Sequence, residues 1–445
     1  MSIATQIMRP DRLQRFAEVW RTEGGARAIK AALRHSRRIA FKEARSDVAP
    51  IPVLSPDPTP HGLPNHAFAP LWRDMARARA FHMHSAPATL RHKRTVAMIG
   101  DLNLPQCRKY RVEQVDELLS KAGVEYRFSH YEDIPRCLDI LQDATHLFMY
   151  RLPAGDLTTM YSYEARRLKL PVLYDIDDPL FSVSAYETYG NMAVLPADLK
   201  SSFIAQAPGY LSAMNAADAI CVSTPGLVAH TTEYTARPVW MRRNFCDVET
   251  LMAGQDAMAR GARERDEFRV AFASGSHGHE IDFAIIADDL VRFLDGAANR
   301  RLMILGTFDV ALLPEPLRDR VLRRPFADYG GYLAWLATAD CAVMPLVDDS
   351  FNRAKSAVRI IDAAAVGVAS LVSDVGDLGA PIKDDVTGYV LADGDSWFDR
   401  LDGLARAPER CREMGSAARH HIEAQWSART DMPVMDPQLL GWITD

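Results

Sequence analysis

Short apolar runs separated by stretches with helical spacing recur along the chain, and this alternation most constrains its fold. The first series of runs lies at 95–100, 124–128, 145–150, 172–175 and 219–223. The second series lies at 269–273, 301–306, 341–345 and 369–373, with a turn into one more strand indicated at 384–390. Such short, continuous runs are typical of strands buried on both faces of a parallel sheet. Their alternation with helices predicts an α/β protein with two doubly wound sheets.

The parts around these two series differ in composition. Residues 49–70 contain seven prolines, which favour an extended connector. Residues 247–266 are polar and poor in strand signals. The predicted segments are 1–48 for a basic helical extension, 49–92 for the proline-rich connector and a helix, 93–246 for the first α/β domain, 247–267 for a linker, 268–425 for the second α/β domain and 426–445 for a C-terminal tail.

Charge is distributed unevenly over the 445 residues. The net charge is −6, but residues 1–46 carry eleven Lys and Arg against four Asp and Glu, so this segment is +7 and the remainder is −13. An acidic chain gives no reason to expect a nucleic-acid partner. For the basic, amphipathic segment at 1–46 we expect one of two roles: peripheral contact with an anionic membrane face, or homo-oligomerisation.

The sequence indicates neither a membrane span nor a cysteine-based metal site. No apolar run approaches the ~20 residues of a spanning helix. The six cysteines are widely scattered, and no C-x-x-C or Cys/His ligand spacing occurs. A reducing cytoplasm is the expected location, at the inner face of the membrane if residues 1–46 bind lipid.

A cluster of cations and one carboxylate follows the run at 341–345. Seven residues separate Lys355 from Asp362, about two helical turns, so a single helix would carry both side chains on one face. A cation near a helix start can bind a diphosphate, and a carboxylate two turns later can accept hydrogen bonds from a ribose diol. A nucleotide sugar needs both contacts, whereas the alternative is an amphipathic helix with surface ion pairs. The donor-binding candidates here are Asn352, Lys355, Arg359 and Asp362.

A glycine-rich loop directly follows the run at 269–273. Gly275, Ser276 and His279 belong to it. Glycines and small hydroxyl side chains let a backbone approach an anion closely, and the helix that follows offers free N–H groups. The loop is therefore a candidate phosphate-binding loop, although a tight turn needs glycine for its geometry alone.

Three carboxylates lie at the end of the run at 172–175. Asp175, Asp177 and Asp178 occupy the carboxyl end of a predicted strand, where a parallel sheet presents its ligand groups. Buried carboxylates are costly unless something binds them. The predicted roles are acceptor recognition or proton transfer, Mg²⁺ coordination, or a solvated strand end that caps a helix.

Three cations follow the run at 95–100. Arg108, Lys109 and Arg111 belong to the predicted loop after that strand. Cations at this end of a sheet can bind the diphosphate of a nucleotide sugar, or an anionic acceptor molecule to which the sugar would be transferred. We expect Arg108 and Arg111 to bind the acceptor and Lys109 to be solvated.

These motifs resemble retaining GT-B glycosyltransferases, notably glycosyltransferase family 4. The resemblance rests on the stretch 352–373, on Gly275-Ser276-x-x-His279-x-x-Asp282-Phe283, and on Tyr174-Asp175-x-Asp177-Asp178-x-x-Phe181. It implies a fold with two Rossmann-like domains that face a cleft. In this fold, tails such as 426–445 often return to the first domain.

The resemblance also implies a reaction and a set of roles. The reaction is transfer of a hexosyl group from a nucleoside-diphosphate sugar to a saccharide or glycolipid acceptor, with retention and without a metal cofactor. Lys355, Asp177 and Asp178 would be the catalytic residues. The donor would contact Gly275, Ser276, His279, Asn352, Lys355, Arg359 and Asp362. The acceptor would contact Arg108, Arg111 and Asp175.

The sequence departs from the family pattern at one position. Family 4 members commonly carry a Glu eight residues before the acid that matches Asp362, and here that position is Ala354. Because that Glu usually contacts the donor sugar, we expect the contact from Asp348, Asp349 or Asn352 instead. Two alternative functions are a GT-B nucleotide-sugar epimerase, and a degenerate relative that binds nucleotide sugars as a scaffold.

Overall fold

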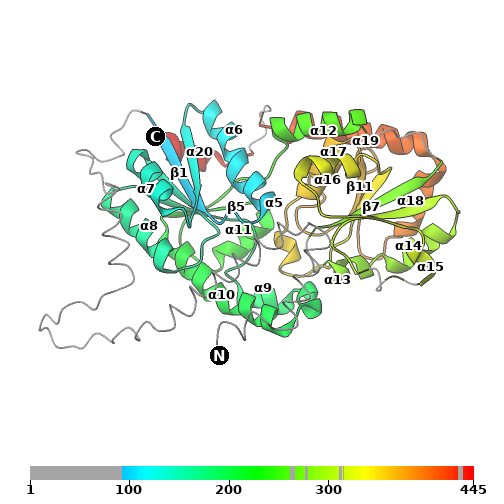
Figure 1. Ribbon diagram of the computed structural model, residues 1–445, viewed down its shortest axis with the longest axis horizontal. Helices are drawn as coiled ribbons and strands as arrows, with labels where there is room; N and C mark the ends of the chain where they lie inside the picture. Colours follow the sequence, from blue (N-terminus) through cyan, green and yellow to red (C-terminus); the bar gives the residue numbers. More distant parts are fainter. Residues whose placement is uncertain (1–92, 261–265, 276–278, 310–312, 314, 429–433) are drawn as a thin grey trace, which may run out of the picture. The chain divides into compact units, whose positions relative to one another are not determined.

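The computed structural model describes residues 93–445 apart from 261–265, 276–278, 310–312, 314 and 429–433. The predicted extension at 1–48 and the predicted connector and helix at 49–92 therefore lie outside the described residues, as does Ser276. The described chain forms two six-stranded sheets (Figure 1). All the strand pairs in both sheets are parallel, so the predicted α/β class is confirmed.

The first sheet has the strand order β2-β1-β3-β4-β5-β6. Its strands are β1 (Thr95–Gly100), β2 (Glu125–His130), β3 (His146–Tyr150), β4 (Val172–Ile176), β5 (Ala219–Val222) and β6 (Val239–Met241). The first five strands match the predicted runs. The edge strand β6 has only three residues, all half-buried, so its apolar run is too short to indicate a buried strand.

Helices follow most of these strands. They are α5 (Pro105–Cys107), α6 (Gln114–Lys121), α7 (Ile134–Asp143), α8 (Asp156–Arg167), α9 (Val183–Thr188), α10 (Ala197–Ala216) and α11 (Pro225–Thr232). A 3-10 helix, Gly190–Val194, lies between α9 and α10. One π-helical turn, Arg108–Glu113, joins α5 to α6. The cations at 108–111 therefore lie on a helical turn, where a loop was expected.

The second sheet has the strand order β12-β11-β10-β7-β8-β9. Its strands are β7 (Phe268–Gly275), β8 (Arg300–Gly306), β9 (Val321–Arg324), β10 (Cys341–Met344), β11 (Ala369–Ser373) and β12 (Gly388–Leu391). If β7 is taken as the first strand of this domain, the strand order read from β9 is 3-2-1-4-5-6, which is the order of the Rossmann fold. Only the edge strand β9, which contains two arginines, was not predicted.

The second half of the chain is also rich in helices. They are α12 (Val248–Arg260), α13 (Glu280–Ala284), α14 (Ala287–Asp295), α15 (Glu315–Arg318), α16 (Tyr329–Leu336), α17 (Val358–Ala365), α18 (Trp397–Arg406), α19 (Pro408–Gln425) and α20 (Pro437–Thr444), with a 3-10 turn at Asn352–Ala354. The segment 247–267, expected as a linker, contains α12. This helix packs on α16 and α17.

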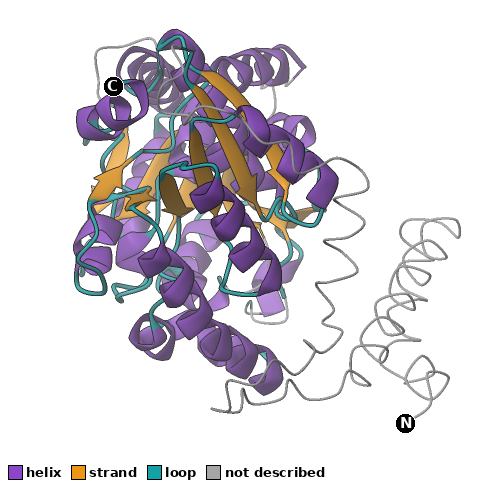
Figure 2. Ribbon diagram, turned by 90° about the vertical axis from the view of Figure 1, so that its left-hand side faces the viewer, coloured by secondary structure: helices purple, strands orange, loops and turns teal. Residues whose placement is uncertain are grey.

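Helices cover both sides of the strands (Figure 2). In β7, Phe268, Val270 and Phe272 pack into one apolar cluster with side chains of α14 and α18. Ala271 and Ala273 pack into a second cluster with side chains of α16 and α17. Successive side chains of a strand point to opposite faces, so burial on both faces explains the continuous apolar run.

The helix α20 belongs to the core of the first domain. Its Leu439 and Ile443 are fully buried in a cluster with residues of β1 and β3. The Nε2 atom of His146, on β3, lies 3.1 Å from the carbonyl oxygen of Trp442. The segment 426–445 thus contacts the first sheet after the chain has completed the second.

A buried cluster of charges fixes the π-helical turn to the first sheet. Arg111 donates two hydrogen bonds to Asp175, from Nε to Oδ1 at 2.9 Å and from Nη2 to Oδ2 at 2.8 Å. Arg242 donates a third from Nη2 to Oδ2 at 3.1 Å. Both members of the Arg111–Asp175 pair are 0% exposed. The expectation that they contact the acceptor is therefore wrong, because each already holds the other inside the core.

This pair leads to a stability prediction. Arg111→Ala should lower the free energy of unfolding by about 3–5 kcal/mol, because it removes one partner of a buried ion pair. Urea denaturation measures the change. Arg108→Ala is the matched control: that side chain is 45% exposed and pairs with Glu113, so it should change the free energy by about 1 kcal/mol or less. Equal stability of the two variants would contradict the prediction.

Candidate functional site

The segment that carries Lys355 is not part of helix α17. Residues Asn352–Ala354 form a 3-10 turn, Lys355 has extended backbone angles (φ −66°, ψ 141°), and α17 begins only at Val358. The expectation that Lys355 and Asp362 share one face of a single helix is therefore wrong. Contacts with the first domain decide the local structure instead, since Thr224 Oγ1 donates to the carbonyl oxygen of Ala354 at 2.9 Å.

Two glycines allow other parts of the chain to approach the backbone of this segment closely. A Cβ atom at Gly226, in α11 of the first domain, would overlap the carbonyl oxygen of Arg353. A Cβ atom at Gly376, in the turn after β11, would lie 2.9 Å from the same oxygen, and Gly376 also has a positive φ of 60°. Thr224, which precedes Gly226, caps α11 by accepting from the N–H of Leu227. The backbone before Lys355 is therefore held by both domains.

The ammonium group of Lys355 lies among acidic and aromatic groups. Its Nζ is 3.9 Å from Oδ1 of Asp178, 5.0 Å from the ring centre of Phe351 and 5.7 Å from that of Tyr189. The two rings stack with their centres 4.3 Å apart. Burial opposes the charge on Lys355, but Tyr189 and Asp178 outweigh it and raise the pKa above its ordinary value. Lys355 is therefore a stable cation.

Asp177 and Asp178 share a cation that the sequence analysis did not identify. Arg151 Nη1 lies 3.2 Å from Oδ1 of Asp177, and its Nη2 lies 3.4 Å from Oδ2 of Asp178. Tyr150 donates to Oδ2 of Asp177 at 3.1 Å. Burial is the main cause that raises the pKa of Asp177. Arg151 directly follows β3 at its carboxyl end, which is the positional signal that would have found it.

The other predicted acidic residue, Asp362, already has partners. Its Oδ1 accepts from the hydroxyl of Tyr110, on the π-helical turn, and from that of Tyr329 at 2.7 Å. Burial raises the pKa of Asp362 to about 6. Binding of a ribose diol by Asp362 stays a prediction, and it requires a rearrangement of these phenols or use of the other oxygen.

Lys109 strengthens the same contact between the domains. Its Nζ lies 3.2 Å from both Asp247 and Glu249, at the start of α12, and 4.5 Å from the ring centre of Tyr329. Its side chain is only 6% exposed. The expectation that Lys109 is solvated is wrong, because its side chain is buried against these two carboxylates. Arg108 alone remains exposed.

The remaining donor-binding candidates gather beyond β7 and β10. Gly275 is the last residue of β7, and Arg359 donates to the carbonyl oxygen of Ala273 at 3.1 Å. His279 Nδ1 lies 3.1 Å from Oδ2 of Asp282. Burial lowers the pKa of His279 to about 4, so its ring is neutral at pH 7. Asn352 also donates to Asp282, at 3.1 Å.

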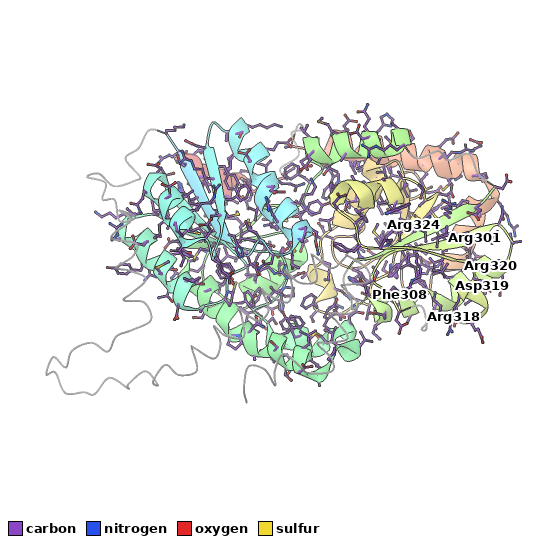
Figure 3. All side chains as sticks on the ribbon, in the orientation of Figure 1. Arg301, Phe308, Arg318, Asp319, Arg320 and Arg324 are labelled. Atoms are coloured by element: carbon purple, nitrogen blue, oxygen red, sulfur yellow. The ribbon has the colours of Figure 1, made fainter. Side chains whose placement is uncertain are left out.

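A second group of cations surrounds the edge strand β9. Figure 3 labels Arg301, Arg318, Arg320 and Arg324 of this group. Arg320 donates to the carbonyl oxygen of Ala297 at 2.9 Å, Arg301 donates to that of Ala298 at 2.7 Å, and the Arg324 guanidinium stacks 4.5 Å from the ring centre of Trp335. The guanidinium groups therefore bind backbone carbonyl oxygens and an aromatic ring of their own domain. We assign them no role in the candidate site.

The described residues indicate no metal site or membrane span. Within the ranges that the structure describes, no group of three or more His, Cys, Asp and Glu side chains is arranged to hold a metal ion. Asp175, Asp177 and Asp178 instead face arginines. In the same ranges, no helix combines the length and apolarity needed to cross a membrane.

Comparisons with known proteins agree with this architecture. Residues 288–433 match the family described as "Glycosyl transferase-like". The chain also resembles the structure of WaaG, a glycosyltransferase involved in lipopolysaccharide biosynthesis, with 12% identity and a TM-score of 0.51 over 78% of this chain and 99% of that one. A search of curated proteins returned no match.

Two further solved structures are similar to the same extent. Sucrose-phosphate synthase from Thermosynechococcus elongatus has 15% identity and a TM-score of 0.50, over 74% of this chain and 94% of that one. A glycosyltransferase from Rickettsia africae ESF-5 has 11% identity and a TM-score of 0.50, over 76% and 96%. Together with the two Rossmann-like sheets, these neighbours show that the protein has the GT-B fold.

The environment of Asp362 predicts a pH dependence of stability. Because the pKa in the folded state, about 6, exceeds the ordinary value of 3.8, ionisation destabilises the fold, and the loss grows as the pH rises from about 4 to 7. Relative to Asp362→Asn, the wild type should lose about 1–2 kcal/mol of unfolding free energy between pH 4.5 and 7, at ~1.4 kcal/mol per pKa unit. Denaturant titrations at several pH values measure the difference. A difference between wild type and Asp362→Asn that stays constant with pH would refute the assignment.

Proposed function

We propose that the protein is a glycosyltransferase that moves a sugar from a nucleoside diphosphate to a saccharide or glycolipid acceptor, with retention of the anomeric configuration. The observation that carries this proposal is the position of Lys355. The cation lies beyond β10 of one Rossmann-like domain and 3.9 Å from Asp178, beyond β4 of the other. Ligands of doubly wound domains bind beyond the carboxyl ends of their strands, so a diphosphate beside Lys355 would place its sugar near both domains.

The residues around Lys355 support a division of roles. The ammonium group would stabilise the negative charge that develops on the leaving diphosphate, and such electrostatic stabilisation is usually the largest catalytic contribution. Asp178 would contact the acceptor hydroxyl. Asp177, which is held by Arg151 and Tyr150, would keep Asp178 and Arg151 in place. No arrangement of two carboxylates for double displacement is evident among the described residues, so we infer a same-face substitution.

Other parts of the proposal rest on the sequence. Exposed Arg108 is the remaining candidate among the predicted acceptor contacts. Residues 1–46 are inferred either to attach the protein to an anionic membrane face, which suits a glycolipid acceptor, or to join two copies of the chain. The family resemblance further supports catalysis without a metal cofactor.

Binding and turnover assays test the proposed function against its alternatives. Calorimetry with UDP, ADP, GDP and their sugar conjugates should identify one nucleotide that binds. Sugar release or transfer from that conjugate separates an enzyme from a scaffold. Dependence of turnover on an added acceptor separates a transferase from an epimerase, and NMR of the first-formed product reports the anomeric configuration. Failure of every nucleotide to bind would refute the proposal.

The first prediction from this proposal concerns Lys355. Lys355→Ala should lower kcat/KM by about 10²-fold, equivalent to about 2.7 kcal/mol, the scale for loss of one contact to the developing charge. Arg353→Ala is the control, because that exposed side chain pairs with Asp348 at 2.6 Å and faces solvent. Unchanged turnover in a folded Lys355→Ala protein would exclude the assigned role.

The second prediction separates acceptor binding from metal binding. Asp178→Asn keeps the shape of the side chain but removes its charge, so turnover should fall by about 10²-fold or more while nucleotide affinity is retained. Treatment of the wild type with EDTA should leave turnover unchanged. Strict dependence on Mg²⁺ would instead assign the aspartates to a metal. Steady-state kinetics with and without the chelator decides between the two.

A further inference from the structure

Two buried asparagines present carbonyl oxygens that have no hydrogen-bond donor. Asn191 lies on the 3-10 helix Gly190–Val194 of the first domain, and Asn352 lies on the 3-10 turn of the second. Their side chains are 1% and 0% exposed. Within the described chain, Oδ1 of neither residue has a partner. A buried acceptor left in this state costs about 1–3 kcal/mol, so a site that retains two of them indicates an absent donor.

The carboxylate of Asp282 fixes the orientation of both amides. Asn191 Nδ2 donates to Oδ2 of Asp282 at 2.6 Å, and Asn352 Nδ2 donates to Oδ1 at 3.1 Å. Rotation of either amide by a half-turn would bring its oxygen against a carboxylate oxygen, with no proton between them. Because an amide oxygen and nitrogen share one carbon, both unpaired oxygens lie beside Asp282.

Asp282 is itself firmly held as an anion. It is 0% exposed, and its Oδ1 also accepts from the N–H of Val347 at 2.9 Å. Burial opposes its charge, but the contacts with His279, Val347 and Asn191 outweigh burial and lower the pKa. The carboxylate thus keeps both amide nitrogens engaged at neutral pH, and only the oxygens remain available.

The two oxygens belong to segments that also surround Lys355. Phe351 precedes Asn352, and Tyr189 lies two residues before Asn191. The rings of Phe351 and Tyr189 stack, and Lys355 Nζ lies 5.0 Å and 5.7 Å from their centres. A second link joins the same segments, since Asp349 accepts from the N–H of Gly190 at 3.2 Å.

The chemistry of the missing donor follows from these surroundings. A phosphate oxygen carries no proton to donate at neutral pH, and a second cation would be repelled by Lys355. A neutral hydroxyl group can donate a hydrogen bond to an amide oxygen without adding a charge to the site. We propose that Asn191 Oδ1 and Asn352 Oδ1 accept hydrogen bonds from hydroxyl groups of the donor sugar, so that residues of both domains select the sugar. This inference rests on the proposed function, and it assigns the sugar contact that Ala354 cannot make.

Calorimetry with matched ligands tests the inference. The probes are the nucleoside diphosphate that the wild type binds and its sugar conjugate, for example UDP and UDP-glucose. Asn191→Ala and Asn352→Ala should each weaken binding of the conjugate by about tenfold and leave affinity for the diphosphate unchanged. Asn215→Ala is the control, because that amide donates only to the carbonyl oxygens of Leu211 and Tyr234. A conjugate whose sugar lacks the relevant hydroxyl should bind the wild type more weakly than the parent conjugate does. For the variant that has lost the matching asparagine, the two conjugates should bind with equal affinity.

The outcomes separate this inference from the proposed function. If no nucleotide binds the wild type, the proposed function fails and the inference fails with it. If the diphosphate binds but both variants retain full affinity for the conjugate, the oxygens are satisfied by buried water and the inference alone is wrong. Equal loss of diphosphate and conjugate binding would show that the asparagines only hold the two domains together. Because Asn191 lies outside the Lys355 segment, it remains a test even if Asn352→Ala fails to fold.

Discussion

The contact of Asp175 with two guanidinium groups is the interaction on which the rest of the structure depends. Arg111 comes from the π-helical turn, and Arg242 comes from the segment that leaves the first domain for the second. Each arginine also donates to the backbone of the other's segment, from Arg111 Nη1 to the carbonyl oxygen of Arg242 at 2.6 Å and from Arg242 Nη2 to that of Arg111 at 2.8 Å. Loss of one partner from a buried group of ions is strongly destabilising, because the charge that remains is uncompensated. The neighbours of these residues, Tyr110 and Asn244, then reach the second domain.

Contacts between the domains explain both what the sequence predicted and what it did not. The parallel strands of each core are visible in the sequence because burial on both faces requires a continuous apolar run. The edge strands β6 and β9 lack this requirement and escape detection. The break before α17 could not be predicted for a different reason. Helical spacing favours a continuous helix from Lys355 to Asp362, but the backbone before Lys355 contacts Thr224 and Gly226, which are more than a hundred residues away in the chain. Tertiary contacts of this kind override local periodicity.

The candidate site shows the same limit at the level of single side chains. The sequence places Asp175, Asp177 and Asp178 together at a strand end, and the structure keeps them there. Asp175 still belongs to β4 and is buried in the core, whereas Asp178 follows the strand and lies beside Lys355. A motif therefore identifies the neighbourhood of a site, whereas the partner of each carboxylate depends on residues such as Arg151 that carry no motif of their own.

The return of α20 to the first sheet has a consequence for the synthesis of the protein. Leu439 and Ile443 complete an apolar core whose first strand begins at Thr95. When the ribosome has synthesised all the strands of the first sheet, it has therefore not yet synthesised α20, which covers part of the core of that sheet. Domains generally fold in the order in which they are made, but here the second domain can be finished while the first still exposes the surface that α20 will cover. Premature termination between α19 and α20 would then leave a second domain with all its helices attached to an aggregation-prone first one.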